Sequence, residues 1–419
     1  MAWVTDHPPA DIDLDSCVTC GLCLPVCPTF RLTGDETASP RGRLTAIAAV
    51  AGGQARVDER FDEITGFCLQ CRACEPVCPS LVPFGSIIEA ARAEAVAQVP
   101  QSYDGVRRFT LGTALGSPLI MRATTLKAAA LQRMGLLKVL PVVGGATAGL
   151  RKLPLPLPSA RGGSWGDRDA DRVVLFTGCL VDTWFSDIHK ATIEVLLAAG
   201  YRVDAPEMQT CCGALASHSG FESDARKLAE ENIAGLIDAP AVIVNVAGCG
   251  AHLKDYGRYG EAGASLASRT LDVTQIVAAA IAEGRLPTLP SNGKKVAVQD
   301  PCHLEYGQGI VEEPRIILRA AGYEVIDADP GGLCCGAAGV YQVDHPETSE
   351  TLGMAKADKV SATGATLVAS ANAGCEMQLR RYLDAGFEVL HPIEIYAKAA
   401  ISRQPSARSR RKRPQSEDR

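Results

Sequence analysis

Two runs of four cysteines lie within the first eighty residues, and each has the spacing C-x2-C-x2-C-x3-C followed by proline. The eight residues are Cys17, Cys20, Cys23, Cys27, Cys68, Cys71, Cys74 and Cys78. Three thiolates spaced three residues apart on a tight turn can reach three irons of one cubane, and the fourth is carried away from them. In two-cluster proteins that fourth cysteine binds the other cluster. The spacing therefore predicts two [4Fe–4S] clusters.

The predicted ligand sets cross between the two runs. Cluster 1 is assigned to Cys17, Cys20, Cys23 and Cys78, and cluster 2 to Cys68, Cys71, Cys74 and Cys27. Such crossing holds the two clusters close enough for electrons to pass between them. Zinc is the alternative metal, but its sites usually pair two C-x2-C knuckles across a longer loop and need four thiolates in total. Two complete runs with both prolines favour the clusters.

The other eight cysteines form two sets, each of which contains the triplet Cys-Cys-Gly. The sets are Cys179, Cys211, Cys212 and Cys249, and Cys302, Cys334, Cys335 and Cys375. Adjacent cysteines seldom form a disulfide with each other, because the geometry is strained. The glycine permits a turn with positive φ, which lets backbone N–H groups approach sulfur. The pattern predicts further iron–sulfur sites or redox-active thiols, and leaves that choice open.

Histidines accompany both sets. His252 follows Cys249 by three positions and can replace a thiolate at iron, although a histidine at the start of a surface helix is the favoured interpretation. His303 follows Cys302 and is either a protonated neighbour that tunes the pKa of this thiol or a packing residue. Residues 254–256 are expected on a solvated helix face.

The elements that position these cysteines can be read from capping signals and periodicity. Ser39 followed by Pro40 predicts the start of a helix through Ile47, and a second helix is expected through Phe61 towards the second run. Residues 101–151 have helical periodicity, and residues 152–165 are rich in proline, glycine and serine, as is typical of a linker.

From residue 172 the chain repeats a strand–helix–strand pattern. Strands are predicted over 172–178 and 201–204, and again over 294–299 and 323–326. Equivalent cysteines are separated by 123, 123 and 126 positions, which indicates a duplicated α/β unit with parallel strands. Each cysteine then lies near the carboxyl ends of the strands, the edge where such sheets place ligands.

The fold class is therefore α+β and multidomain, with an α-helical ferredoxin domain for two [4Fe–4S] clusters followed by a duplicated α/β cysteine-rich domain. The expected boundaries are 1–100 for the ferredoxin domain, 101–171 for the helical segment and linker, 172–290 and 291–400 for the two α/β units, and 401–419 for a basic disordered tail.

Composition excludes several functions. The formal net charge of the 419 residues is -6, although the tail from Arg403 carries seven basic and two acidic residues. An acidic body argues against binding nucleic acid. Sixteen cysteines without a signal peptide suggest a reducing, cytoplasmic setting. No apolar stretch reaches the roughly 18 residues of a membrane span, so any membrane contact is expected to be peripheral, on the inner face of the cell membrane. A P-loop and a dinucleotide-binding glycine motif after a strand are both missing.

The chain resembles the Cys-Cys-Gly domains of heterodisulfide reductases and, more closely, the iron–sulfur subunits of glycolate oxidase. The matching segments are Cys17–Arg43, Cys68–Ser80, Cys211–Leu215, Gly248–Gly257, Asp300–Gly309 and Cys334–Tyr341. The resemblance implies an electron-transfer subunit that works with FAD-binding oxidase subunits and passes electrons from glycolate towards a quinone-type acceptor. Lactate or glycerol-3-phosphate oxidation, and thiol–disulfide reduction, are the alternatives.

One departure from the full Cys-Cys-Gly motif concerns its last cysteine, which begins a C-x2-C pair in heterodisulfide reductases. Here His252 and Gln378 stand where the second cysteine of each pair is expected. The fifth thiolate that helps to hold the non-cubane clusters of those enzymes is therefore missing from both units, so cluster binding by the two units is left open.

Overall fold

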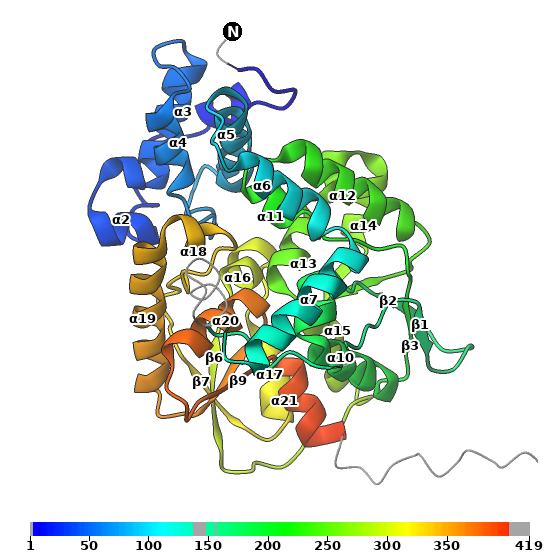
Figure 1. The fold of residues 1–419 in the computed structure, drawn as a ribbon. Coiled ribbons are helices and arrows are strands. Elements are labelled where there is room, and N and C mark those ends of the chain that lie inside the picture. The colour runs from blue at the N-terminus through cyan, green and yellow to red at the C-terminus, as the bar shows by residue number, and fades with distance from the viewer. Residues whose placement is uncertain (1–2, 137–147, 156, 402–419) are drawn as a thin grey trace, which may run out of the picture.

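The amino end folds into a group of short helices, and the rest of the chain forms two largely parallel sheets with helices around them (Figure 1). The computed structural model describes residues 3–136, 148–155 and 157–401. The predicted tail of residues 401–419 therefore lies outside the described residues, apart from Ile401. Within the described ranges, no helix combines the length and the apolar character needed to cross a bilayer.

The N-terminal part consists of α1 (Asp11–Asp15), α2 (Pro28–Thr33), η1 (Glu36–Ala38), α3 (Pro40–Ala51), α4 (Glu59–Gly66) and α5 (Phe84–Gln98). Helix α3 begins as predicted, because Ser39 Oγ accepts a hydrogen bond from the Gly42 N–H at 2.9 Å and Pro40 is the first helical residue. Helix α4 is capped by the Asp58 carboxylate, which accepts from the Phe61 N–H. Both predicted helices are confirmed, and their apolar faces pack in one small core.

The middle segment is helical, as predicted, over α6 (Asp104–Arg108), η2 (Phe109–Ala114) and α7 (Pro118–Arg133). The predicted linker of residues 152–165 is wrong at its carboxyl end. Its last residues form β1 (Gly163–Trp165), which pairs antiparallel with β3 (Arg202–Ala205), and Leu153 and Leu157 are buried. The sequence gives no local sign of this, because a short edge strand is stabilised by a partner about forty residues away rather than by its own composition.

The first sheet has the strand order β1-β3-β2-β4-β5, with β2 (Arg172–Leu175), β4 (Val242–Val244) and β5 (Thr270–Asp272) parallel to β3 in the ladder. Its helices are α9 (Leu180–Trp184), α10 (Ser186–Ala198), α11 (Ala214–His218), α12 (Glu222–Gly235), α13 (Ala247–Lys254), η4 (Tyr256–Tyr259), α14 (Glu261–Ser268) and α15 (Val273–Ala282). The cysteines follow β2, β3 and β4, at the carboxyl edge that the sequence predicts.

The second sheet has the order β7-β6-β8-β9 and is entirely parallel, with strands β6 (Lys295–Gln299), β7 (Glu324–Asp327), β8 (Leu367–Ser370) and β9 (Glu388–Leu390). Its helices are α16 (Cys302–Gln308), α17 (Glu312–Ala320), α18 (Tyr341–Asp344), α19 (Pro346–Ala362), α20 (Ala373–Tyr382), α21 (Pro392–Tyr396) and η5 (Ala397–Ile401). The order matches β3-β2-β4-β5 of the first sheet, so the predicted duplication is confirmed.

The two α/β units pack against each other over a shared apolar core. Ile188 of the first unit and Ile317 of the second belong to one buried cluster. The backbone also crosses the junction, where the Ala247 N–H donates a hydrogen bond to the Ala371 carbonyl at 3.1 Å. The cysteine-bearing loops of both units are thereby held in a fixed relation to each other.

Candidate iron–sulfur centre

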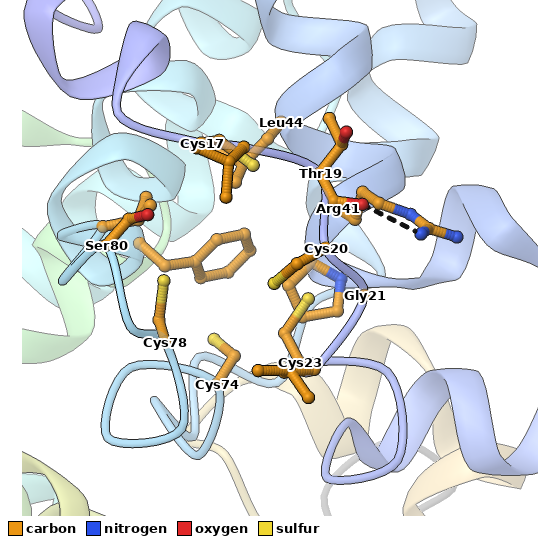
Figure 2. Close-up of a pocket in the computed structure, with 15 residues that line it drawn as sticks. Cys17, Thr19, Cys20, Gly21, Cys23, Arg41, Leu44, Cys74, Cys78 and Ser80 are labelled. Carbon is orange, nitrogen blue, oxygen red and sulfur yellow. Dashed lines mark hydrogen bonds between the residues drawn. The ribbon is translucent and has the colours of Figure 1, made fainter.

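Five cysteines line a cavity between the two N-terminal runs (Figure 2). They are Cys17, Cys20, Cys23, Cys74 and Cys78. The cavity has about 450 Å³ of empty space, part of it open to solvent, and its other walls include Leu44, Val82 and Phe84. Thiols around a space with apolar walls suit an iron–sulfur cube, which needs a thiolate at each iron. The residues present therefore fit a cluster, and four of these cysteines form the set predicted for cluster 1.

The two runs repeat the same backbone conformation. Thr19 and Gln70, each two residues after the first cysteine of its run, have φ of 56° and 51°. Gly21 and Arg72, each directly after the second cysteine, have φ of 84° and 63°. These left-handed residues turn the chain tightly, which brings successive thiols to one side. The equivalence supports a common role for the two runs.

The three remaining thiols of the two runs gather with Cys74, which also borders the first cavity, at a second and more deeply buried position. Cys27, Cys68, Cys71 and Cys74 are all buried, and the first three lie close enough to Cys74 for their charges to raise its pKa. Burial is the largest cause of the raised pKa of both Cys71 and Cys74. Thiols in such surroundings ionise when a metal neutralises their charge. These four residues fit the set predicted for cluster 2.

A half-buried arginine fixes the second run against the helices around it. The Arg92 guanidinium donates hydrogen bonds to the carbonyl groups of Thr65, Gly66 and Cys68. It also donates to the carbonyl of His218 at 2.6 Å, which ties the second run to the first α/β unit. Sequence reasoning missed this residue, because no local motif connects α5 with α11.

In the first α/β unit, the four cysteines meet as two close pairs. The Sγ atoms of Cys179 and Cys211 are 3.5 Å apart, and those of Cys212 and Cys249 are 3.3 Å apart. Gly213 has a φ of 90°, as the Cys-Cys-Gly triplet predicts. The thiols are packed in the core of their own unit.

The second unit repeats this arrangement. The Sγ atoms of Cys335 and Cys375 are 3.0 Å apart, and the thiols of Cys302 and Cys334 are hydrogen-bonding neighbours. Gly336 has a φ of 80°, so the predicted positive φ is confirmed in both units. Each set of four is thus brought together as the sequence predicts. Iron binding by either set stays a prediction.

The second unit also contacts the second cysteine run directly. Cys71 and Cys334 belong to one buried cluster, with Cys302 packed against it. After burial, the charge of Cys302 is the largest cause of the raised pKa of Cys71. The set predicted for cluster 2 therefore borders the thiols of the second α/β unit.

A smaller polar cavity lies where the three parts of the chain meet. Gln70 and Glu89 line it from the N-terminal part, His218 and His252 from the first unit, and His303 from the second. The Glu89 carboxylate accepts a hydrogen bond from His218 Nδ1 at 2.7 Å, and hydrogen bonds and charge from His218 help to hold the pKa of Glu89 well below its usual range against the effect of burial. Among the described residues, Nε2 of His252 and Nε2 of His303 have no hydrogen-bond partner.

The interpretation of His252 as a histidine at the start of a surface helix is wrong. His252 is only 4% exposed, because α13 lies in the interior between the two units and packs against α16. Burial lowers the pKa of His252 to about 3, which keeps the imidazole neutral at pH 7. A neutral imidazole is the form that binds metals, and iron binding by His252 stays a prediction. Gln378, the corresponding residue of the second unit, donates instead to the carbonyl of Ser349.

Two further expectations are corrected. Burial lowers the pKa of His303 to about 3, so His303 is not a protonated neighbour of Cys302 at pH 7. Residues 254–256 do not form a solvated helix face. Tyr256 is fully buried and donates to the carbonyl of Cys212 at 2.7 Å, and Asp255 pairs with Arg72 at 2.9 Å. These residues join parts of the chain that are distant in sequence.

Comparisons with known proteins agree with this arrangement. A family model described as a 4Fe-4S dicluster domain matches residues 13–82, and one described as a cysteine-rich domain matches 173–254 and 296–380. The lactate utilization protein A 2 of Bacillus cereus (strain Q1) is 28% identical over 239 residues, which cover 54% of this chain and 98% of that protein.

Two relatives match nearly the whole chain. The probable glycolate oxidase iron-sulfur subunit of Bacillus subtilis is 33% identical over 402 residues, which cover 88% of both proteins. The glycolate oxidase iron-sulfur subunit of Escherichia coli is 30% identical over 401 residues, which cover 93% of this chain and 95% of that protein. With the dicluster domain and the duplicated cysteine-rich unit in the same order along the chain, this protein belongs to the family of glycolate oxidase iron–sulfur subunits.

Proposed function

We propose that this chain carries electrons from an FAD-containing subunit that oxidises glycolate to a quinone-type acceptor. The observation that carries the proposal is the match to two glycolate oxidase iron–sulfur subunits over 88% or more of each protein. Oxidation of glycolate to glyoxylate releases two electrons and two protons. Because the sequence has no dinucleotide-binding glycine motif after a strand, the flavin and its hydride chemistry are expected on a partner subunit.

The proposed ligands of cluster 1 are Cys17, Cys20, Cys23 and Cys78, and those of cluster 2 are Cys68, Cys71, Cys74 and Cys27. When bound, such clusters take up and release one electron at a time. The chain's own contribution is to hold the thiols at fixed positions and to surround them with apolar side chains. The cavity of Figure 2, the repeated backbone turns and the burial of the second set support this assignment.

The proposed route begins at cluster 1, because Cys20 is the one exposed residue among the sixteen cysteines. A partner can therefore approach this thiol closely. The route continues to cluster 2, whose ligand Cys71 borders Cys302 and Cys334. We assign the cysteine sets of the two α/β units as further redox sites, with the second unit next in line.

Counting metal in ligand variants tests the proposal. Anaerobically purified protein is expected to contain about eight irons in the N-terminal part, and Cys78→Ser is expected to remove up to about four of them. The EPR signal that disappears should be the one lost in Cys17→Ser, although residues 17 and 78 belong to different runs. Ser80→Ala, which alters the same cavity without removing a thiol, is the matched control.

The ligand assignment fails if Cys78→Ser and Cys17→Ser remove different signals, or if the purified protein contains zinc in place of iron. The function is tested by isolating the chain from its own cells and assaying the associated proteins. Recovery of a flavoprotein that reduces the clusters when glycolate is added supports the proposal. Recovery without any flavoprotein contradicts it.

A lactate-oxidising complex is the second candidate, because the chain covers 98% of a lactate utilization protein A at 28% identity. Substrate choice would then belong to the partner. The same preparation distinguishes the two candidates, since cluster reduction by lactate but not by glycolate favours the second.

A further inference from the structure

Helix α7 has two faces of different kinds. One face consists of Met121, Thr125 and Ala129, which are all buried against the protein. Trp184 of α9 donates its indole N–H to Thr125 Oγ1 at 3.0 Å, which fixes the rotation of the helix. Since successive residues of a helix are about 100° apart, the opposite face of α7 must point away from the core.

That opposite face is apolar although it is exposed. Leu119, Leu126 and Met134, the last directly after α7, are 80%, 48% and 61% exposed. The exposed Ala123 and Ala130 lie between them. Positions 119, 123, 126, 130 and 134 follow the helical repeat, so they form one stripe, here called the α7 stripe. In Figure 1 this helix runs along the side of the molecule turned to the viewer. A contiguous apolar stripe on a surface marks a binding face.

The charge around the α7 stripe is positive. Helix α7 contains three basic residues and no acidic one, in a chain whose net charge is -6. Arg122 and Arg133 flank the stripe on one side and Lys127 on the other, as their helical positions require. Among the described residues, the two arginines donate to backbone carbonyl groups rather than to carboxylates, so their charge is not neutralised by an ion pair.

An exposed apolar stripe with basic residues on both flanks is the pattern of helices that lie in the interface of a membrane with anionic lipids. The leucines reach into the acyl boundary, while the basic side chains meet lipid phosphates. An apolar stripe alone would suit a protein partner equally well. In the part of the chain that the structure describes, none of the three basic side chains that flank the α7 stripe forms an ion pair with a carboxylate, so the stripe has charge complementarity to an anionic surface, and this favours the lipid.

We propose that α7 docks the protein on an anionic membrane surface through the α7 stripe, with Arg122, Lys127 and Arg133 contacting lipid headgroups. This assigns a role to the helical segment that joins the ferredoxin part to the α/β units. It also gives the electron path a fixed position near a membrane-dissolved acceptor. The docking does not depend on which acid the partner oxidises, so it can fail without the proposed function failing.

Co-sedimentation with lipid vesicles tests the proposal on the full chain with its clusters. Binding is expected to vesicles of phosphatidylcholine with 30% phosphatidylglycerol (on the order of the anionic content that attracts basic segments), to weaken as salt is raised, and to be much weaker with phosphatidylcholine alone. The double variant Leu119→Asp and Leu126→Asp is expected to lower binding about tenfold or more. Ile12→Asp changes an equally exposed residue of the ferredoxin part, 80% exposed, and should leave binding unchanged.

The tail must be tested separately, because it is also basic. Replacement of Arg410, Arg411, Lys412 and Arg413 by serine is expected to retain most of the binding if α7 is the docking element. The proposal is overturned if those replacements abolish binding while the α7 double variant binds normally. It is also overturned if the α7 variant loses a partner subunit but sediments with anionic vesicles as before. Iron content and visible absorbance show that each variant is folded.

Discussion

Charged side chains that donate to backbone carbonyl groups help to hold the second cysteine run in place. Arg92 is the clearest case, since its guanidinium donates to the carbonyl groups of Thr65, Gly66 and Cys68 at the start of the second run, and to the carbonyl of His218. Thr65 and Gly66 are the last residues of α4, and the final carbonyl groups of a helix have no donor within the helix. One side chain thus replaces several missing backbone partners.

We expect Arg92→Ala to destabilise the protein by about 3 kcal/mol, because it removes the hydrogen bonds of one guanidinium to four backbone carbonyl groups. Thermal unfolding should shift to lower temperature, and iron should be lost to a chelator faster than from the parent protein. Arg60→Ala is the control, since the Arg60–Glu63 pair is largely exposed and is worth about 0.5 kcal/mol or less. Equal effects of the two substitutions would contradict the positioning role of Arg92.

Sequence reasoning succeeded where a signal is local. The cysteine spacings, the Ser39–Pro40 helix start and the repeated strands all depend on residues close together in the chain, and the fold family followed from them. It failed for β1, for His252 and for the cavity residues Glu89 and His218, whose environments are created by contacts between distant segments. A histidine in a helix has no pattern that distinguishes a buried site from a surface one before the packing of α13 against α16 is known.

At the scale of elements, the residue that caps the amino end of α15, Asp272, titrates in a range where stability can depend on pH. Asp272 caps α15, accepting hydrogen bonds from the Thr274 N–H and hydroxyl, and it is completely buried. Burial raises the pKa of Asp272 to about 6; the hydrogen bonds from Thr274 and the charge of Lys254 lower it, while Glu313 raises it. The folded protein therefore holds a proton on this residue at a pH where the unfolded chain has released it.

Because the pKa is higher in the folded state, the contribution of Asp272 to the free energy of unfolding decreases as pH rises through the range from about 4 to about 6 between the two pKa values, by on the order of 3 kcal/mol in total. Asp272→Asn keeps a good capping residue and removes the titration. The variant is expected to show a flatter dependence of unfolding temperature on pH in this window, and to gain stability relative to the parent at pH 7. Asp58→Asn, at the cap of α4, controls for the capping change. An unchanged pH dependence in Asp272→Asn would show that other groups dominate.

At the scale of the whole molecule, the two α/β units are not equivalent, although they are duplicates. The thiols of the first unit lie in the core of that unit, whereas Cys302 and Cys334 of the second are packed with Cys71 of the N-terminal part. The two units contain similar cysteine sets, but the helical N-terminal part packs Cys71 against the second set. The second set is therefore the neighbour of the thiols predicted for cluster 2. Electron exchange between the two halves of the chain is therefore expected through the second unit.

Substitution of equivalent cysteines tests this asymmetry. The reduction potential of a cluster depends on nearby charge, on hydrogen bonds to its sulfurs and on solvent exposure, so a change beside Cys71 should alter cluster 2. Cys302→Ser removes a neighbouring sulfur and is expected to raise the potential of one N-terminal cluster by on the order of 30 mV, about 0.7 kcal/mol for one electron. Cys179→Ser, the duplicate position in the first unit, should leave both potentials unchanged. The measurement is a redox titration followed by low-temperature EPR, with iron content as a check that the N-terminal clusters are still present. Equal shifts in the two variants would mean that contact with Cys71 does not govern the coupling, because only one of the two substituted thiols packs beside that residue.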